Sequence, residues 1–518
     1  MRQKSTLPTW SDLSLEQQIG QMLIIRASGY CFDQQIRYPT WEAPQRQLSR
    51  WLQELNLGGV ILLGGSALEV AYRIHKLQEW ADIPLLIAAD LEEGVGQRFT
   101  GATHFPPPLA LGAIAATQPD LAVEYARNMG AITAKEALAI GINWLLAPVT
   151  DVNNNPANPV INIRAFGETP EIVTNLATAF ITGARQYPVL TTAKHFPGHG
   201  DTSIDSHLSL PTLNHSISRL QTIELPPFQG AIASGVDSIM SGHLLIPCWD
   251  KQYPATVSRE ILTHQLRENL GFNGLIVTDA LIMGGITNYA SPETIAVEAI
   301  KAGADLLLMP TNPEITIQAI LDAVNSGYLT RERIAASLQR IWRAKTRVIS
   351  SDSYHPLAQL SQPLATETVT AILTQSNRCG GNLPLNNPCT NLIVVDNLLD
   401  REMVAFHSPA VTIPQAKGYP PLLVDQRILP HLPPQPCLLQ LFVRGNPFRG
   451  SAGLSPQTQI IYQQLLQQGL IQGLVIYGSP YILEWFLPQL PSDLPWVFSY
   501  GQMSQAQAIA LQQLLITT

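Results

Sequence analysis

The sequence has few charged residues. Of its 518 residues, 14% are charged and 46% are hydrophobic, whereas an average soluble protein has about 25% charged residues. Disordered chains combine low hydrophobicity with high net charge, so this composition excludes a mainly disordered chain. Acidic side chains outnumber basic ones, 39 to 31, which gives a formal net charge of −8. A nucleic acid or an anionic membrane surface is therefore not the expected partner.

Cysteines and long apolar runs are also scarce. The five cysteines are scattered, and no two form a C-x-x-C pair, so neither a disulfide framework nor a zinc ribbon is expected. No stretch approaches the ~18 consecutive apolar residues that a membrane span requires. Residues 1–23 also lack the apolar run of a signal peptide. We therefore expect a protein with no membrane span that resides in the cytoplasm.

Short apolar runs alternate with helical segments over the first 310 residues. These runs are nearly continuous in hydrophobicity, as in parallel strands that are covered on both faces. Eight such units predict a (β/α)₈ TIM-like barrel over residues 1–350, with an open doubly wound sheet as the alternative. The expected strands are Met22–Ile25, Gly59–Leu63, Leu85–Asp90, Ile142–Val149, Leu190–His195, Asp237–His243, Gly274–Asp279 and Ala304–Met309.

A smaller C-terminal α/β domain is predicted over residues 376–518, after a linker at 351–375. This domain carries as many acidic as basic side chains. It contains no Gly-rich nucleotide motif, P-loop or G-x-S-x-G sequence, so we expect a packing or partner-binding role. The expected strands are Leu392–Asp396, Leu438–Val443, Gly473–Tyr477 and Trp496–Tyr500, and the expected helices are Gln457–Gln468 and Gln502–Leu515.

Reactive side chains follow several of the barrel strands. Because the active site of such a barrel lies at the carboxyl ends of its strands, we expect these residues to meet at one mouth. The residues are Asp90 and Arg98 after the third strand, Asp151 and Arg164 after the fourth, the segment Lys194–His207 after the fifth, His243 at the sixth and Asp279 at the seventh.

The segment Lys194–His207 carries most of the predicted chemistry. Gly198 and Gly200 leave its backbone free to turn, so the loop is expected to be mobile or sharply turned. Asp205 lies two residues before His207, and at this spacing a carboxylate can hold an imidazole and raise its basicity.

Two chemistries fit this group of residues. The histidines and aspartates could bind a metal ion, but the sequence lacks an H-x-H pair on the first strand and an H-E-x-x-H motif, so no metal is favoured. Cleavage of a glycosidic bond needs a proton donor and a carboxylate near the anomeric carbon. Asp279 fits the carboxylate role and the Asp205–His207 pair fits proton transfer.

The ordered motifs resemble glycoside hydrolase family 3, and specifically its β-N-acetylglucosaminidase branch. The similarity covers most of residues 15–345. It rests on Lys194-His195-Phe196-Pro197-Gly198-His199-Gly200, Asp205-Ser206-His207, Thr278-Asp279-Ala280, Asn158-Pro159-Val160-Ile161, Arg164-Ala165-Phe166-Gly167 and Met240-Ser241-Gly242-His243.

The resemblance implies a retaining hydrolase that needs no cofactor and releases terminal β-N-acetylglucosamine. It implies that Asp279 is the nucleophile and that Asp205 and His207 form the acid/base dyad. The substrate would be a small carbohydrate or muropeptide derived from peptidoglycan; the oligomeric state is left open. The terminal sugar would be bound by Asp90, Arg98, Arg164, Lys194, His195 and His243.

One loop departs from the family pattern. The branch usually reads Asp-x-Glu-Gly-Gly-Arg where this chain has Asp90-Leu91-Glu92-Glu93-Gly94-Val95, so we expect a different loop geometry here. A β-glucosidase and a phosphorylase are alternatives on the same scaffold, because a histidine acid/base repels an attacking phosphate less than a carboxylate would. A non-catalytic carbohydrate-binding protein is the more distant alternative.

Overall fold

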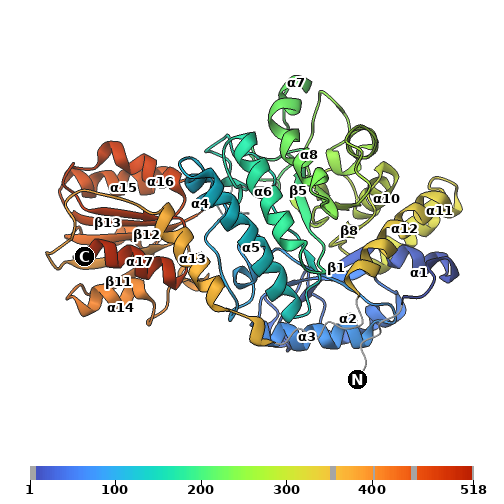
Figure 1. The fold of residues 1–518 in the computed structure, drawn as a ribbon, viewed down its shortest axis with the longest axis horizontal. Coiled ribbons are helices and arrows are strands. Elements are labelled where there is room, and N and C mark those ends of the chain that lie inside the picture. Colours follow the sequence, from blue (N-terminus) through green and yellow to red (C-terminus); the bar gives the residue numbers. More distant parts are fainter. Residues whose placement is uncertain (1–6, 350–356, 401–402, 445–451, 516–518) are drawn as a thin grey trace.

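The structure is a computed structural model that describes residues 7–349, 357–400, 403–444 and 452–515. A barrel and a smaller domain lie side by side along its long axis (Figure 1). None of the described helices combines the length and the apolar content that crossing a membrane requires.

The first part of the chain is a closed barrel of parallel strands, as predicted. The order β4-β3-β2-β1-β8 forms one sheet and β5-β6-β7 another. Parallel bridges from Trp144 to Leu190 and from Val277 to Leu306 join the two sheets into a ring, which excludes the open sheet. The strands are β1 (Leu23–Ser28), β2 (Gly59–Leu63), β3 (Leu86–Ala89), β4 (Trp144–Leu145), β5 (Thr192–Phe196), β6 (Ser238–Ser241), β7 (Leu275–Thr278) and β8 (Leu307–Leu308).

Side chains fill the interior of the barrel. The indole of Trp144 is fully buried there, and its Nε1 donates hydrogen bonds to Thr192 Oγ1 at 2.8 Å and to Ser238 Oγ at 3.1 Å. A buried indole N–H needs such a partner, and these bonds fix the ring across three strands. The barrel is therefore a packed core, with its reactive groups confined to one end.

Helices surround the barrel. Several begin at capping side chains; Ser291, for example, caps α10 by accepting a bond from the Thr294 N–H. The segment Glu260–Asn269 forms a helix of the π type. The α-helices are α1 (Leu15–Gly20), α2 (Gln45–Glu54), α3 (Ala67–Trp80), α4 (Leu109–Ala115), α5 (Pro119–Ala139), α6 (Pro170–Ala184), α7 (Ile217–Arg219), α8 (Leu225–Ala233), α9 (Gly284–Thr287), α10 (Pro292–Ala302), α11 (Pro313–Asn325) and α12 (Arg331–Val348).

The C-terminal domain has a sheet of its own, in the order β11-β10-β12-β13-β14-β9, with β9 antiparallel and the other strands parallel. Alternate strand residues pack on α14 and α17 on one face and on α15 and α16 on the other. The elements are β9 (Arg378–Gly380), β10 (Thr390–Val395), β11 (Pro421–Asp425), β12 (Cys437–Val443), β13 (Ile471–Gly478), β14 (Trp496–Ser499), α14 (Pro409–Ala416), α15 (Pro456–Gln467), α16 (Pro480–Phe486) and α17 (Ser504–Leu515).

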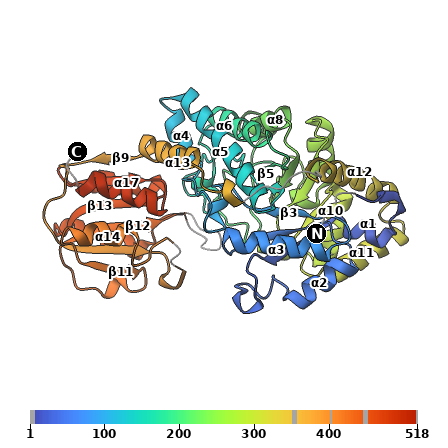
Figure 2. The ribbon, with the colours of Figure 1, turned by 60° about the horizontal axis from the view of Figure 1, so that its bottom comes forward.

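Two details of the sequence-based description need correction. Strands β9 and β11 were not predicted; both lie at sheet edges, where a short, exposed strand or one that begins with proline is tolerated. The interval 351–375, expected to be a linker, contains most of helix α13 (Pro363–Ser376). This helix contacts α4 and α5 of the barrel and α17 of the second domain (Figure 2).

Candidate active site

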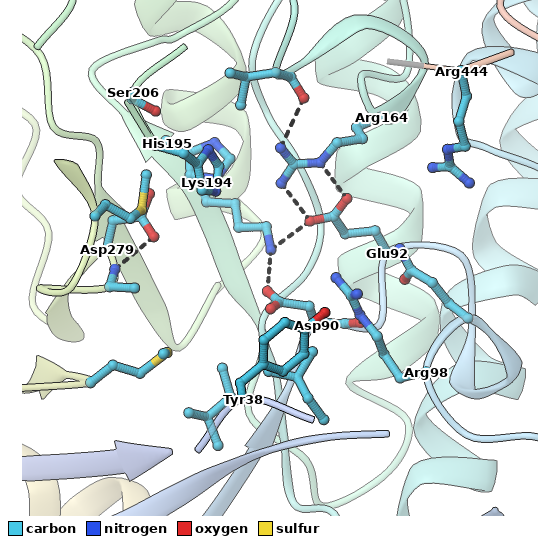
Figure 3. Close-up of a pocket in the computed structure, with 18 of the residues that line it drawn as sticks. Tyr38, Asp90, Glu92, Arg98, Arg164, Lys194, His195, Ser206, Asp279 and Arg444 are labelled. Carbon is cyan, nitrogen blue, oxygen red and sulfur yellow. Dashed lines mark hydrogen bonds and ion pairs between the residues drawn. The ribbon is translucent and has the colours of Figure 1, made fainter. Parts of the chain in front are cut away.

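A cavity of about 710 Å³ lies at the carboxyl ends of the barrel strands, and residues of both domains line it. Figure 3 shows how its polar side chains converge. Seven of the nine residues predicted to form the site line this cavity: Asp90, Arg98, Arg164, Lys194, His195, His207 and Asp279. The other two, Asp205 and His243, are buried beside it.

One wall is a network of buried and partly buried charges (Figure 3). The Nζ atom of Lys194 lies 2.8 Å from Asp90 Oδ1 and 2.6 Å from Glu92 Oε1. Glu92 in turn accepts two bonds from Arg164, both at 2.8 Å, and Arg98 Nε donates to the carbonyl of Asp90 at 3.2 Å. Glu92 was not predicted as a site residue, although it fixes two of the predicted cations.

The network keeps its members ionised. Burial alone would raise the pKa of Asp90 and Glu92, but the adjacent cations lower both, that of Glu92 well below its usual value. Burial likewise disfavours the charged form of Lys194, yet Asp90 and Glu92 hold its pKa above normal. The pocket thus offers charged donors and acceptors, which form stronger hydrogen bonds than neutral groups do.

Asp279 follows β7 at the opposite side of the pocket (Figure 3). Its Oδ1 accepts a 2.8 Å bond from the Ala280 N–H. Burial favours the protonated acid, but the imidazoles of His195, His243 and His207 outweigh this effect and lower the pKa of Asp279. An ionised carboxylate in this position suits nucleophilic attack.

Two histidines are fixed around Asp279. His195 Nδ1 donates a hydrogen bond to Asp151 Oδ2 at 2.7 Å. His243 is fully buried, with Nε2 donating to the Ala280 carbonyl at 3.1 Å and Nδ1 bonded to the Thr256 hydroxyl at 2.7 Å. His243 therefore supports the segment that carries the carboxylate.

The loop after β5 is sharply turned. Gly198 has φ = 129°, and a Cβ atom on Gly200 would lie 1.7 Å from the Val152 carbonyl oxygen, so both positions need glycine. His199 is buried between them and bonds Thr202 Oγ1 and Ser206 Oγ, both at 2.8 Å. Burial lowers the pKa of His199 to about 4, so its ring is neutral at physiological pH.

The predicted dyad forms at the end of this loop. His207 Nδ1 lies 2.9 Å from Asp205 Oδ1, and the Asp205 side chain is 1% exposed while that of His207 is 19% exposed. The carbonyls of Ser206 and His207 accept bonds from Gly285 and Gly284 at 3.0 Å. These two glycines begin α9, so the dyad is tied to the segment that follows Asp279.

Other lining residues were missed by the sequence analysis. Tyr38 and Trp41 stack on each other with ring centroids 5.7 Å apart, and the Arg26 guanidinium lies 4.7 Å from the centroid of Tyr38. Arg444 comes from the C-terminal domain. The paired aromatics in the loop 29–44 are a usable signal, whereas nothing near Arg444 in the sequence connects it to the barrel.

A metal site is not apparent in the part of the chain that the structure describes, which has no suitable group of three or more His, Cys, Asp or Glu side chains.

Comparison with known families identifies both parts of the chain. Residues 14–344 match the Glycosyl hydrolase family 3 N terminal domain, and residues 384–516 match the Bacterial Glycosyl hydrolase family 3 C-terminal domain. The chain belongs to glycosyl hydrolase family 3. The family resemblance read from the motifs is thereby confirmed.

Several known proteins are similar over most of the chain. Beta-hexosaminidase A of Pseudoalteromonas piscicida is 34% identical over 427 residues, covering 74% of this chain and 71% of that protein. A family 3 beta-N-acetylglucosaminidase from Paenibacillus sp. str. FPU-7 superposes with a TM-score of 0.79 at 29% identity, covering 98% of both chains. A beta-glucoside phosphorylase reaches 0.82 at 22% identity, covering 98% of this chain and 93% of that one; at that identity the likeness shows the fold alone.

Proposed function

We propose that this protein is a retaining exo-β-N-acetylglucosaminidase that removes terminal N-acetylglucosamine from peptidoglycan fragments in the cytoplasm. The observation that carries the proposal is the shared pocket of Asp279 and His207. An ionised carboxylate and an imidazole backed by a buried carboxylate line one cavity with a wall of charged sugar-binding groups. The similarity to proteins named beta-hexosaminidase supports the choice of sugar.

The reaction proceeds in two steps. Asp279 attacks the anomeric carbon while His207 gives its Nε2 proton to the leaving oxygen, so the bond to the aglycone breaks and a glycosyl ester forms on Asp279. Water then attacks the same carbon and gives a proton to His207, which releases the sugar with retained configuration. Asp205 holds the Nδ1 proton of His207 in both steps and stabilises the imidazolium.

The terminal sugar is held by the charged wall. Asp90 and Lys194 bond its hydroxyls, together with Arg98 and His195, while Arg164 acts through Glu92 or on the acetamido group. His243 acts behind the site by holding the Ala280 carbonyl.

The sugar assignment is tested with aryl glycosides that differ only at C2, acetamido against hydroxyl. We expect turnover of the acetamido compound and a loss of about a thousandfold or more in Asp279→Ala. Asp120→Ala, at an exposed position at the start of α5, is the control. Wild-type turnover by Asp279→Ala would refute the assignment of Asp279 as the nucleophile. Preference of the wild type for the hydroxyl compound would indicate a β-glucosidase.

The role of His207 is tested with leaving groups of different acidity. General acid catalysis contributes about 10²–10⁴-fold, so we expect His207→Ala to lose roughly this much with poorly acidic phenols and far less with dinitrophenol. The rate of glycosyl-enzyme formation is compared between His207→Ala and the wild type for each leaving group in the series. An equal loss for every leaving group would contradict proton donation by His207.

Phosphorolysis is the second candidate. A histidine acid/base leaves one negative charge fewer near an incoming phosphate than a second carboxylate would. Products formed with and without phosphate decide between the two reactions, since only phosphorolysis yields a sugar 1-phosphate. Binding of muropeptides without any turnover would instead favour a carbohydrate-binding protein.

A further inference from the structure

An ion pair between the two domains lies at the edge of the pocket. Arg444 follows β12 in the C-terminal domain, and its guanidinium contacts the Glu93 carboxylate at 2.5 and 3.2 Å. The Glu93 side chain is 1% exposed and that of Arg444 is 26% exposed. His104 Nε2 lies 3.2 Å from the same carboxylate, so Glu93 receives both a barrel contact and a contact from the other domain.

Glu93 belongs to the loop that carries the sugar-binding groups. Its neighbour Glu92 fixes Arg164 and Lys194, and Asp90 lies three residues before it. Among the described residues, the backbone of Glu93 bonds to its own loop and the adjoining segment, through Gln97 Oε1 at 3.0 Å and the Phe105 N–H at 2.8 Å. The side chain of Glu93 connects this loop to the C-terminal domain.

The charge of Glu93 depends on this contact. Burial would raise the pKa of the carboxyl, but Arg444 and His104 lower it to about 2. Without Arg444 the loop would contain a buried carboxylate that is only partly compensated, directly beside Glu92. Such a charge draws in water or shifts the backbone, and either change displaces the neighbouring sugar-binding groups.

The second domain also lines the cavity directly, through Val395, Asp396, Asn397, Phe442, Arg444 and Gln502.

We propose that Arg444 is a positioning residue through which the C-terminal domain holds the loop Asp90–Gly94 in its substrate-binding geometry. This inference rests on the proposed function in that the loop is taken to bind the terminal sugar. The C-terminal domain is then part of the substrate site, in contrast to the packing or partner-binding role expected from its sequence.

The test compares full-length variants. Arg444→Met and Glu93→Gln break the ion pair, and Arg444→Lys keeps the charge. Tyr481→Phe is the matched control, because the Tyr481 hydroxyl also joins the domains, bonding Glu168 at 2.5 Å and Asn153 at 2.7 Å, but does not line the cavity. Each variant is assayed for KM and kcat with the aryl glycoside that the wild type turns over best, and for its melting temperature.

We expect Arg444→Met and Glu93→Gln to raise KM about tenfold with kcat changed less than about threefold. Arg444→Lys should recover part of the loss, the double variant should be no worse than the worse single one, and Tyr481→Phe should keep the wild-type KM. If the ion-pair variants have a lower melting temperature but an unchanged KM, the proposal is wrong. Glu93→Gln, which keeps the size of the side chain, preserves the test if Arg444→Met does not fold.

The two proposals fail separately. The sugar assignment is decided by the wild type on the C2 panel, whereas the KM comparison uses whichever aryl glycoside that panel selects.

Discussion

Asp151 organises two histidines of the pocket with one buried carboxylate. It accepts bonds from His195 Nδ1 and from the backbone N–H of His199, both at 2.7 Å. The sequence places Asp151 at the end of a strand, as it does Asp90 and Asp279. It gives no reason to choose Asp151 as the carboxylate that supports neighbouring histidines. Which carboxylate faces substrate and which supports a neighbour depends on depth in the fold, and strand spacing carries no information on depth.

His199 is expected to affect proton transfer indirectly, by holding the segment that carries Asp205 and His207. Its bond to Ser206 lies directly between Asp205 and His207 in the chain. We expect His199→Gln and Ser206→Ala each to slow glycosides with poor leaving groups about tenfold, with much less effect on dinitrophenyl glycosides. Rates across a leaving-group series measure this, and if the double variant loses the sum of the two effects, the residues do not act through their mutual bond.

The strands that are covered by helices on both faces of the sheet were predicted well. The eight barrel strands are apolar runs that overlap the observed ones, because parallel strands covered on both faces leave a continuous signal. The edge strands β9 and β11 left none: β9 is three residues long and mostly exposed, and β11 begins at Pro421. Their pairing is decided by neighbours that are distant in sequence.

Helix α12 contacts residues that precede the barrel strands, at the end opposite the pocket, and carries cations that are partly or fully buried. Arg333 and Arg340 contact Asp305, just before β8, at 3.4 and 3.1 Å. Lys345 is fully buried, and its Nζ bonds Gln21 Oε1 at 2.7 Å and the Pro84 carbonyl at 2.6 Å. Its partners are neutral oxygens, and burial lowers its pKa from 10.5 to about 7.

Lys345 is therefore expected to make the free energy of unfolding depend on pH in the alkaline range. Between pH 7 and 10.5 the unfolded chain keeps the proton and the folded chain loses it, so stability rises with pH in this window, by at most about 1.4 kcal/mol per unit. Below pH 7 the full penalty of the buried charge remains. Denaturant unfolding from pH 7 to 10 should show this slope in the wild type and in Lys251→Met, an exposed control, but not in Lys345→Met. Equal slopes in all three would contradict it.

At the scale of the whole molecule, the two-part organisation was predicted but the shared cavity was not. Barrel residues reach the mouth because their strands run parallel, a general property of the fold. Arg444 reaches Glu93 across 351 positions of sequence, and this contact depends on how the domains dock through α13. Local patterns of polarity do not encode such docking, so the wall formed by the second domain could be found only in the structure.

We expect the two domains to unfold together. Helix α13 contacts elements of both, and the buried Glu93 would lose Arg444 if they separated, so docking and folding are coupled. Calorimetry, activity and tryptophan emission should therefore give one coincident transition. A separate transition that precedes loss of the barrel would contradict this coupling.

The stack of Tyr38 and Trp41 beside Arg26 gives the protein an optical label of its own. The chain has nine tryptophans, and among the described residues that line the cavity Trp41 is the single one. A ligand that enters there displaces water from one indole and leaves the other eight unchanged. Occupancy of the pocket can therefore be followed by emission in the absence of any reaction, with Trp41→Phe as the blank.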